Sequence, residues 1–170
     1  MTLKFTLILL LATSLSFSQR GRREANPVFR EISNKAVVQS VYPEAVKVEK
    51  VNDFWYQVLD KNNRVIGFAL SSVPHCSDII GYNGTTPVLI ITNTKGIIQK
   101  VGLLSHYETM SYVRILESCG FFDLWTNKAL KNAKQVTLDG YSGATQTALA
   151  IERNIHFLID HGINQMPKRK

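Results

Sequence analysis

Two pairs of apolar segments, each joined by a short polar turn, constrain the fold of this chain more than any other feature. The segments and turn of the first pair are residues 54–59, 60–64 and 65–70, and those of the second are residues 87–92, 93–96 and 97–104. Runs rich in β-branched and aromatic residues, bounded by Asn, Asp and Gly, are typical of β-hairpins. The sequence therefore predicts two hairpins and, with them, a sheet whose strands are mostly antiparallel.

Three other segments have apolar residues at helical spacing. They are residues 27–42, 108–119 and 146–160. Asn26 and Pro27 suit the start of the first helix, whereas Gly120 and Gly162 suit the ends of the other two. The buried face of the second helix is expected to carry Tyr112, Ile115, Leu116 and Cys119. Three helices therefore accompany the two hairpins.

The remaining segments complete the pattern of elements. Residues 45–51 and 136–138 are expected to be short strands, and residues 121–125 a further turn of helix. The irregular stretch 71–86 is interpreted as a functional loop, because sheet-like sequence follows it at once. This order predicts an α+β fold, in which a mostly antiparallel sheet built from two hairpins has helices packed against one face.

The first 18 residues have the pattern of a secretory signal peptide. Lys4 precedes an apolar run over residues 5–12, and Ser16-Phe17-Ser18 offers small residues for cleavage. The run is shorter than the roughly 20 residues that cross a bilayer, so we expect cleavage rather than a membrane anchor. The mature chain is then residues 19–170, a length suited to one domain, in the periplasm or another compartment outside the cytoplasm.

The chain is basic, with 20 Lys and Arg against 13 Asp and Glu and a formal net charge of +7. Lys4 accounts for one of these charges, so +6 remains after cleavage. Basic residues are scattered apart from runs at 20–23 and 168–170, and no nucleic-acid-binding motif accompanies them. Nucleic acid is therefore not an expected partner, whereas an acidic protein or membrane surface is.

The two cysteines, Cys76 and Cys119, do not form a Cys-x-x-Cys pair. After export they could form one disulfide. They could equally remain two separate buried thiols. The sequence leaves both possibilities open.

The most specific motif is Asp139-Gly140-Tyr141-Ser142-Gly143-Ala144-Thr145, immediately before the third predicted helix. Thr145 falls in the first turn, where free backbone N–H groups and the positive end of the helix dipole favour a phosphate. Gly143 and Ala144 leave room for the backbone to approach such a group. On the residues alone, Ser142 could instead be a simple N-cap of the helix.

This motif resembles the flavinylation motif of the FMN-binding domain family, which includes subunits of ion-coupled NADH and ferredoxin oxidoreductases and a periplasmic domain of the nitrous-oxide-reduction regulator. The resemblance implies FMN bound covalently, through a phosphoester, to Thr145. It also implies a partner, a flavin transferase that uses FAD and magnesium and reads Asp139 in its substrate. The cofactor expected from the resemblance is therefore FMN.

Two further elements match that family in the same order, namely Gly81-Tyr82-Asn83-Gly84 and His106-Tyr107-Glu108-Thr109. The resemblance implies a flavin site made of Tyr82, His106, Glu108, Thr109, Asp139, Tyr141, Ser142, Gly143, Ala144 and Thr145. Tyr82 and Tyr141 lie beside glycines, and their aromatic faces suit a flat ring. As a metal pair, His106 and Glu108 would need at least one more ligand, and as structural residues Glu108 would simply start a helix.

The expected function is that of an exported flavoprotein that relays electrons between partner proteins, one of them a membrane-bound or periplasmic redox protein. Two alternatives stay open. The same flavin could reduce a small molecule directly, which would make the protein an enzyme, or the chain could be a basic binding domain without redox activity. No G-x-G-x-x-G follows a strand and no G-x-S-x-G is present, so neither NAD binding nor a serine nucleophile is expected.

Overall fold

The computed structural model describes residues 35–138 and 141–167. Three of the sequence predictions lie outside these residues: the signal peptide over residues 1–18, the start of the first helix at Asn26-Pro27, and the role of Asp139. The first described helix, α1 (Lys35–Val41), ends before Pro43 as predicted. Within the described residues, no helix is both long enough and apolar enough to cross a membrane.

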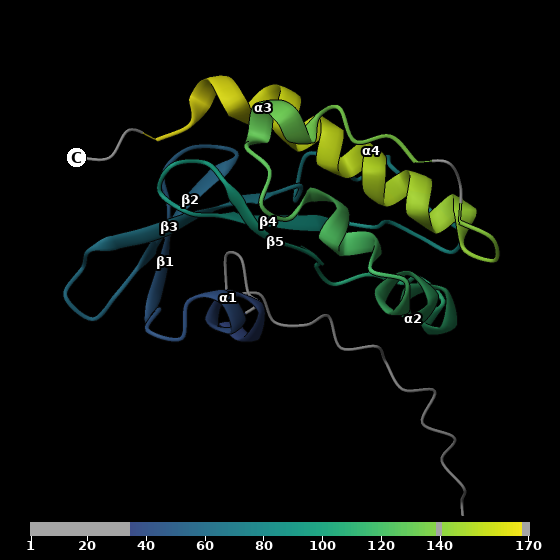
Figure 1. Cartoon of the computed structure of the whole chain (residues 1–170), viewed down its shortest axis with the longest axis horizontal. Helices are drawn as coiled ribbons and strands as arrows, with labels where there is room; N and C mark the ends of the chain where they lie inside the picture. Colours follow the sequence, from purple (N-terminus) through teal and green to yellow (C-terminus); the bar gives the residue numbers. More distant parts are fainter. Residues whose placement is uncertain (1–34, 139–140, 168–170) are drawn as a thin grey trace, which may run out of the picture.

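One antiparallel sheet of five strands forms the centre of the structure (Figure 1). Its strands are β1 (Lys47–Lys50), β2 (Trp55–Leu59), β3 (Val65–Ser71), β4 (Val88–Thr92) and β5 (Ile98–Leu103), and they are hydrogen-bonded in sequence order. The β2–β3 and β4–β5 pairs are the two predicted hairpins. The α+β fold and the antiparallel sheet are therefore confirmed.

Helices cover both faces of this sheet, whereas the sequence predicted helices against one face only. Alternate strand residues such as Trp55, Phe68 and Ile90 form a core with α4 (Thr145–Gly162) and the short 3-10 helix η1 (Phe121–Trp125). The intervening residues, such as Tyr56 and Leu89, form a second core with α1. Figure 1 shows α4 and α1 on opposite sides of the strands. The strands carry apolar residues on both faces, so both faces require cover.

The second predicted helix is α2 (Met110–Ser118), but its buried face differs from the prediction. Val113 and Leu116 are its buried residues, whereas Ile115 and Cys119 are exposed. Helical spacing alone is compatible with a buried face that contains Val113 or one that contains Ile115, since both residues are apolar and β-branched. Only the position of the helix against the sheet selects one of them.

One local prediction after η1 was also wrong. Residues 136–138 form no strand, because they follow the short helix α3 (Leu130–Ala133) as irregular chain. The edge of β5 is instead covered by residues 127–129, with Ile98 N–H bonded to the Lys128 carbonyl at 2.9 Å and Asn127 N–H to the Ile98 carbonyl at 2.8 Å. These bonds occupy the edge that a further strand would need.

The C-terminal end of α4 is fixed to the sheet by a close contact at Gly162. The Trp55 indole N–H donates to the Gly162 carbonyl at 2.8 Å, and a Cβ on Gly162 would lie 2.5 Å from Leu70 Cδ2. Gly162 has φ −82° and continues into the 3-10 helix η2 (Ile163–Gln165). α4 thus ends at Gly162 as predicted, in a right-handed conformation, and the glycine also permits close packing on the sheet.

Candidate functional site

The turn that leads into α4 presents the hydroxyl of Thr145 at the surface. Thr145 is the first residue of the helix, and Ala144 is the N-cap residue. The Tyr141 carbonyl accepts both the Ala144 N–H at 3.0 Å and the Thr145 hydroxyl at 2.7 Å. Gly143 has φ +83°, a conformation that a residue with a Cβ rarely adopts. The Ser142 hydroxyl is therefore not the helix cap, and the exposed Thr145 occupies the predicted first turn.

A shallow cavity of about 240 Å³ lies beside this turn. It is lined by Tyr82, Tyr112, Gly143, Ala144, Thr145, Gln146 and Thr147. Tyr82 and Thr145 stand sixty-three positions apart in the sequence, and the fold brings the segments that carry them to the same opening. Figure 1 shows α2 and the start of α4 at the same end of the molecule. The structure thus joins two of the three predicted motifs directly around one cavity.

Two tyrosines form the aromatic wall of this cavity. The rings of Tyr82 and Tyr112 meet edge to face with their centroids 5.0 Å apart, and Tyr82 is 57% exposed. Repulsion from the charge of an ionised Tyr82 and a hydrogen bond with it raise the pKa of Tyr112. The Tyr112 phenol is therefore neutral at neutral pH, and the two rings offer aromatic surface to a planar ligand.

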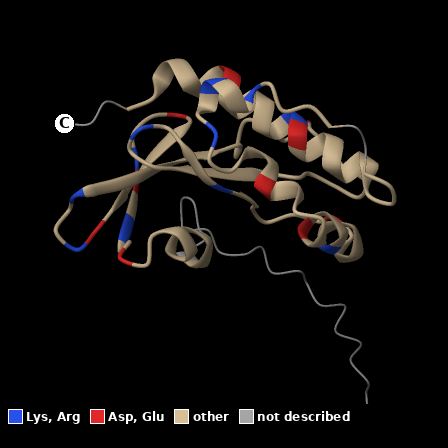
Figure 2. Ribbon diagram, in the orientation of Figure 1, with Lys and Arg blue, Asp and Glu red and all other residues tan. Residues whose placement is uncertain are grey.

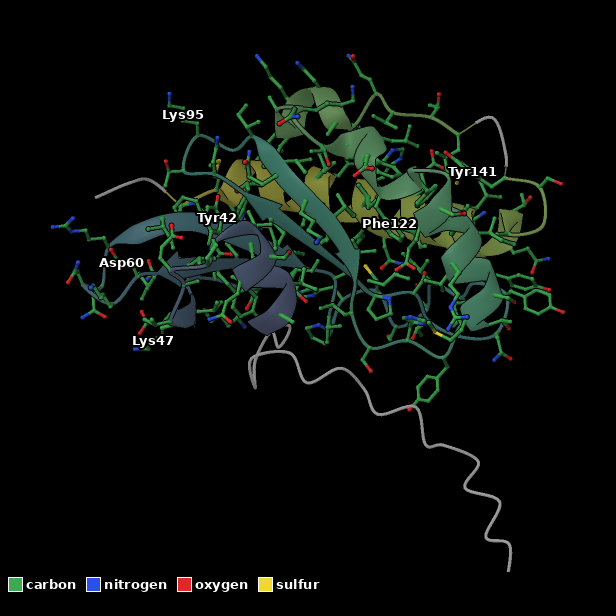
Figure 3. The ribbon with its side chains drawn as sticks, turned by 60° about the horizontal axis from the view of Figure 1, so that its bottom comes forward. Tyr42, Lys47, Asp60, Lys95, Phe122 and Tyr141 are labelled. Carbon is green, nitrogen blue, oxygen red and sulfur yellow. The ribbon has the colours of Figure 1, made fainter. Side chains whose placement is uncertain are left out.

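Tyr141, predicted to stack on a flavin, does not line the cavity. Its half-buried ring packs edge to face on Phe121, with centroids 5.0 Å apart. Figure 3 shows Tyr141 at the α2 end of the molecule, away from the hairpin turn marked by Asp60. A contact between Tyr141 and a flavin stays a prediction, whereas its packing anchors the motif to the core.

The segment His106–Thr109 lies beneath the cavity. Glu108 is fully buried and accepts hydrogen bonds from the Asn83 backbone N–H at 3.1 Å and from the Thr147 hydroxyl at 2.8 Å. The Glu108 N–H donates to His106 Nδ1 at 3.2 Å, and Thr109 is the N-cap residue of α2. These residues support the cavity from below, and their contact with a cofactor stays a prediction.

Thr147 and Tyr112 are site residues that the sequence reasoning missed. Thr147 is fully buried on the apolar side of α4, four residues before Ile151. A hydroxyl at a core position needs a hydrogen-bond partner, and this requirement was the signal that could have identified Thr147. Tyr112 was expected in the core, and its exposed edge could be recognised only once α2 was placed.

Neither a disulfide nor a metal cluster is found in the part of the chain that the structure describes. Cys76 is buried, Cys119 is exposed, and both are free thiols, so the disulfide alternative and the pair of buried thiols are both wrong. No group of three His, Cys, Asp or Glu side chains converges among the described residues. The side chains that line the cavity carry hydroxyl, amide and aromatic groups.

An exposed hydroxyl at the start of a helix, beside an aromatic wall and a left-handed glycine, defines a domain suited to a planar cofactor with a phosphate. The comparison with protein families agrees, because residues 81–160 match the model of the FMN-binding domain. This segment, a little under half of the chain, is therefore similar to the FMN-binding domain family. The match begins at Gly81 and contains both cavity walls and α4 up to Asp160.

Among solved structures, the chain is similar to NqrC of Shewanella oneidensis. The two are 16% identical, with a TM-score of 0.43, and the similarity covers 84% of this chain and 81% of that chain. No curated protein matches the chain.

Proposed function

We propose that this protein carries FMN covalently on Thr145 and relays electrons between partner proteins. The observation that carries the proposal is the exposed Thr145 hydroxyl at the first residue of α4, at the opening of the aromatic cavity. The first N–H groups of a helix have no carbonyl partner within it, and the helix dipole adds positive potential there. A phosphate on Thr145 Oγ1 would be stabilised by both effects.

The proposed attachment is a transfer from FAD by a magnesium-dependent flavin transferase. Thr145 Oγ1 forms a bond to the phosphorus on the flavin side, the pyrophosphate P–O bond breaks, AMP leaves, and the hydroxyl proton is released. No oxidant or reductant takes part. The hydrogen bond from Thr145 to the Tyr141 carbonyl is lost in this step, because the ester oxygen has no proton to donate.

The dimensions of the cavity favour a relay over a small-molecule reductase. Pockets that enclose small ligands usually have volumes of about 300–1,000 Å³, whereas this cavity has about 240 Å³ and one wall, Tyr82, is largely exposed. An open cavity of this size would leave an edge of a bound flavin uncovered. The bound flavin would supply the redox chemistry, and the chain would hold and orient it with its edge accessible to a protein.

The charge distribution is consistent with a protein partner of opposite charge. Figure 2 shows Lys and Arg interspersed with Asp and Glu over the described elements, while the chain as a whole has a formal charge of +7. A net positive charge increases the rate of encounter with an acidic partner. We propose a membrane-bound or periplasmic redox protein as that partner, met after export of the chain.

Replacement of Thr145 by Ala tests the attachment. We expect the wild-type chain, produced in an exporting host with the transferase, to keep its flavin absorbance after denaturation. Its intact mass should exceed that of the polypeptide by FMN less one water. Thr145→Ala should lose both signals completely and still fold, because Thr145 is exposed and outside both cores.

Ser118→Ala is the matched control for this test. The Ser118 hydroxyl also donates to a backbone carbonyl, that of Ile115 at 2.9 Å, on an exposed part of α2. The Ser118→Ala variant should keep the wild-type flavin content. Flavin that stays bound to denatured Thr145→Ala would refute the assignment of the residue, and a wild-type chain without flavin would favour a binding domain without redox activity.

A further inference from the structure

A buried carboxylate connects the two walls of the cavity. Oε1 of Glu108 accepts the Asn83 N–H at 3.1 Å, and Oε2 accepts the Thr147 hydroxyl at 2.8 Å. Asn83 follows Tyr82 on one wall, and Thr147 comes two residues after Thr145 on the other. Glu108 is 0% exposed and does not line the cavity. Its position is thus behind the site and not in it.

The chain around Glu108 is shaped to admit this side chain. The Gly81 N–H donates to the Gly84 carbonyl at 2.7 Å, which closes the turn that carries Tyr82. A Cβ on Gly81 would clash with Glu108 Oε1, so only glycine leaves room for the carboxylate. The Asn83 side-chain amide donates to the Tyr107 carbonyl at 2.8 Å and fixes the same turn to the segment before α2.

We infer that Glu108 is a positioning residue for the flavin, which it orients by holding the turn of Tyr82 and the first turn of α4 at a fixed separation. The inference rests on the proposed function. Hydrogen bonds to a carboxylate are stronger than those between neutral groups, and water cannot replace them at a buried site. The role of Glu108 is therefore indirect, through the N–H of Asn83 and the hydroxyl of Thr147.

A second buried hydrogen bond between the same segments provides a control. Asn154 lies seven residues after Thr147 on α4, and its side-chain amide donates to the Thr86 hydroxyl at 3.2 Å. Thr86, Thr147 and Asn154 are all 0% exposed. Thr86→Val and Thr147→Val thus each remove one buried hydroxyl between this segment and α4. Only Thr147 is bonded to Glu108 and adjacent to the cavity.

The test compares Glu108→Gln, Thr147→Val, Thr147→Ser and Thr86→Val in the flavin-loaded protein. At equal flavin content, we expect Glu108→Gln and Thr147→Val to change the visible circular dichroism and the reduction potential of the flavin. Exchange of the Asn83 amide with deuterium should accelerate about tenfold or more in both. Thr147→Ser retains the hydroxyl and should restore the wild-type values. Thr86→Val should lower the unfolding midpoint and leave the flavin signals unchanged.

Wild-type flavin dichroism and potential in Thr147→Val would overturn the inference, and this comparison decides the matter even where Glu108→Gln does not fold. Equal flavin changes in Thr86→Val would also overturn it, because the effect would then be general to the segment. Exchange measured in a Thr145→Ala background separates the two proposals. If Glu108→Gln and Thr147→Val leave the exchange rate of the Asn83 amide unaltered in that background, the role of Glu108 is refuted. If they accelerate the exchange but the wild-type chain carries no flavin, the proposed function alone is refuted.

Discussion

The two cysteine residues have opposite surroundings, and these surroundings determine how each thiol reacts. Burial of Cys76, and to a smaller extent the charge of Asp78, raise the pKa of its thiol to about 11, although a hydrogen bond with Ser72 opposes the shift. Cys119 is exposed at the end of α2, with its Sγ 3.3 Å from the Leu116 carbonyl. The thiolate is the reactive form of cysteine, so Cys76 is protected by both its burial and its protonation.

Alkylation with iodoacetamide at pH 8 should therefore modify Cys119 and spare Cys76 in the folded protein. Peptide mass spectrometry gives the extent of labelling at each site. Below its raised pKa the buried Cys76 thiol stays neutral. Reaction at Cys76 should therefore begin only as the pH approaches that pKa, or when the protein unfolds. Cys119→Ser should show no labelling at pH 8. Equal labelling rates at the two residues would contradict this prediction.

At the scale of elements, the contact between α4 and the sheet depends on the missing side chain of Gly162. Alanine at a helical position ordinarily stabilises by about 1 kcal/mol relative to glycine. A Cβ here would lie 2.5 Å from Leu70 Cδ2, and Leu70 is fully buried and cannot move away easily. Overpacking of this kind costs about 1–3 kcal/mol, so the steric cost exceeds the gain in helix propensity.

We expect Gly162→Ala to lower the free energy of unfolding by up to about 2 kcal/mol, measured by urea titration. Gly102→Ala on β5 is the matched control, since its Cβ would meet Val37 Cγ1 at 3.6 Å, an ordinary contact distance. That variant should be as stable as the wild type or slightly more so. A stability of Gly162→Ala at or above that of the wild type would show that the helix end can shift on the sheet.

The sequence predicted the elements whose signals are local. The hairpin turns at residues 60–64 and 93–96 carry Asn, Asp or Gly that fix the chain reversal, and α4 has a long apolar stripe. Features that depend on tertiary contact could not be predicted in this way. The helix ends at Gly162 as expected, but the close approach of Trp55 and Leu70 from the sheet, which also requires glycine there, could not be predicted.

The same distinction applies to the candidate site. Thr145 could be placed at the start of a helix from its motif alone, and the structure places it there. The pairing of Tyr82 with Tyr112, and that of Glu108 with Thr147, join segments that are distant in sequence. No local pattern encodes such pairs, because each depends on how the β4–β5 hairpin and α2 direct the chain back to α4.

At the scale of the whole molecule, the proposed function includes export of the chain. Lys4, the apolar run over residues 5–12 and the small residues before Gln19 predict cleavage after Ser18. N-terminal sequencing of protein from the compartment outside the cytoplasm should give a chain that begins at or near Gln19. Replacement of Leu9 and Leu10 by Arg should interrupt the apolar run and keep the protein in the cell. Recovery of intact Met1 outside the cytoplasm would contradict cleavage.

The length of α4 separates the two ends of the molecule. Its 18 residues extend over about 27 Å, with Thr145 at one end and the Trp55 contact at the other. The chain continues from that far end to Pro167. Before this residue, the Gln165 carbonyl accepts a hydrogen bond from the Asn52 side-chain amide at 3.0 Å. A protein tethered to an electrode near Gln165 would therefore hold the Thr145 end toward solution. Such a film would present the cavity beside Thr145 to soluble partners.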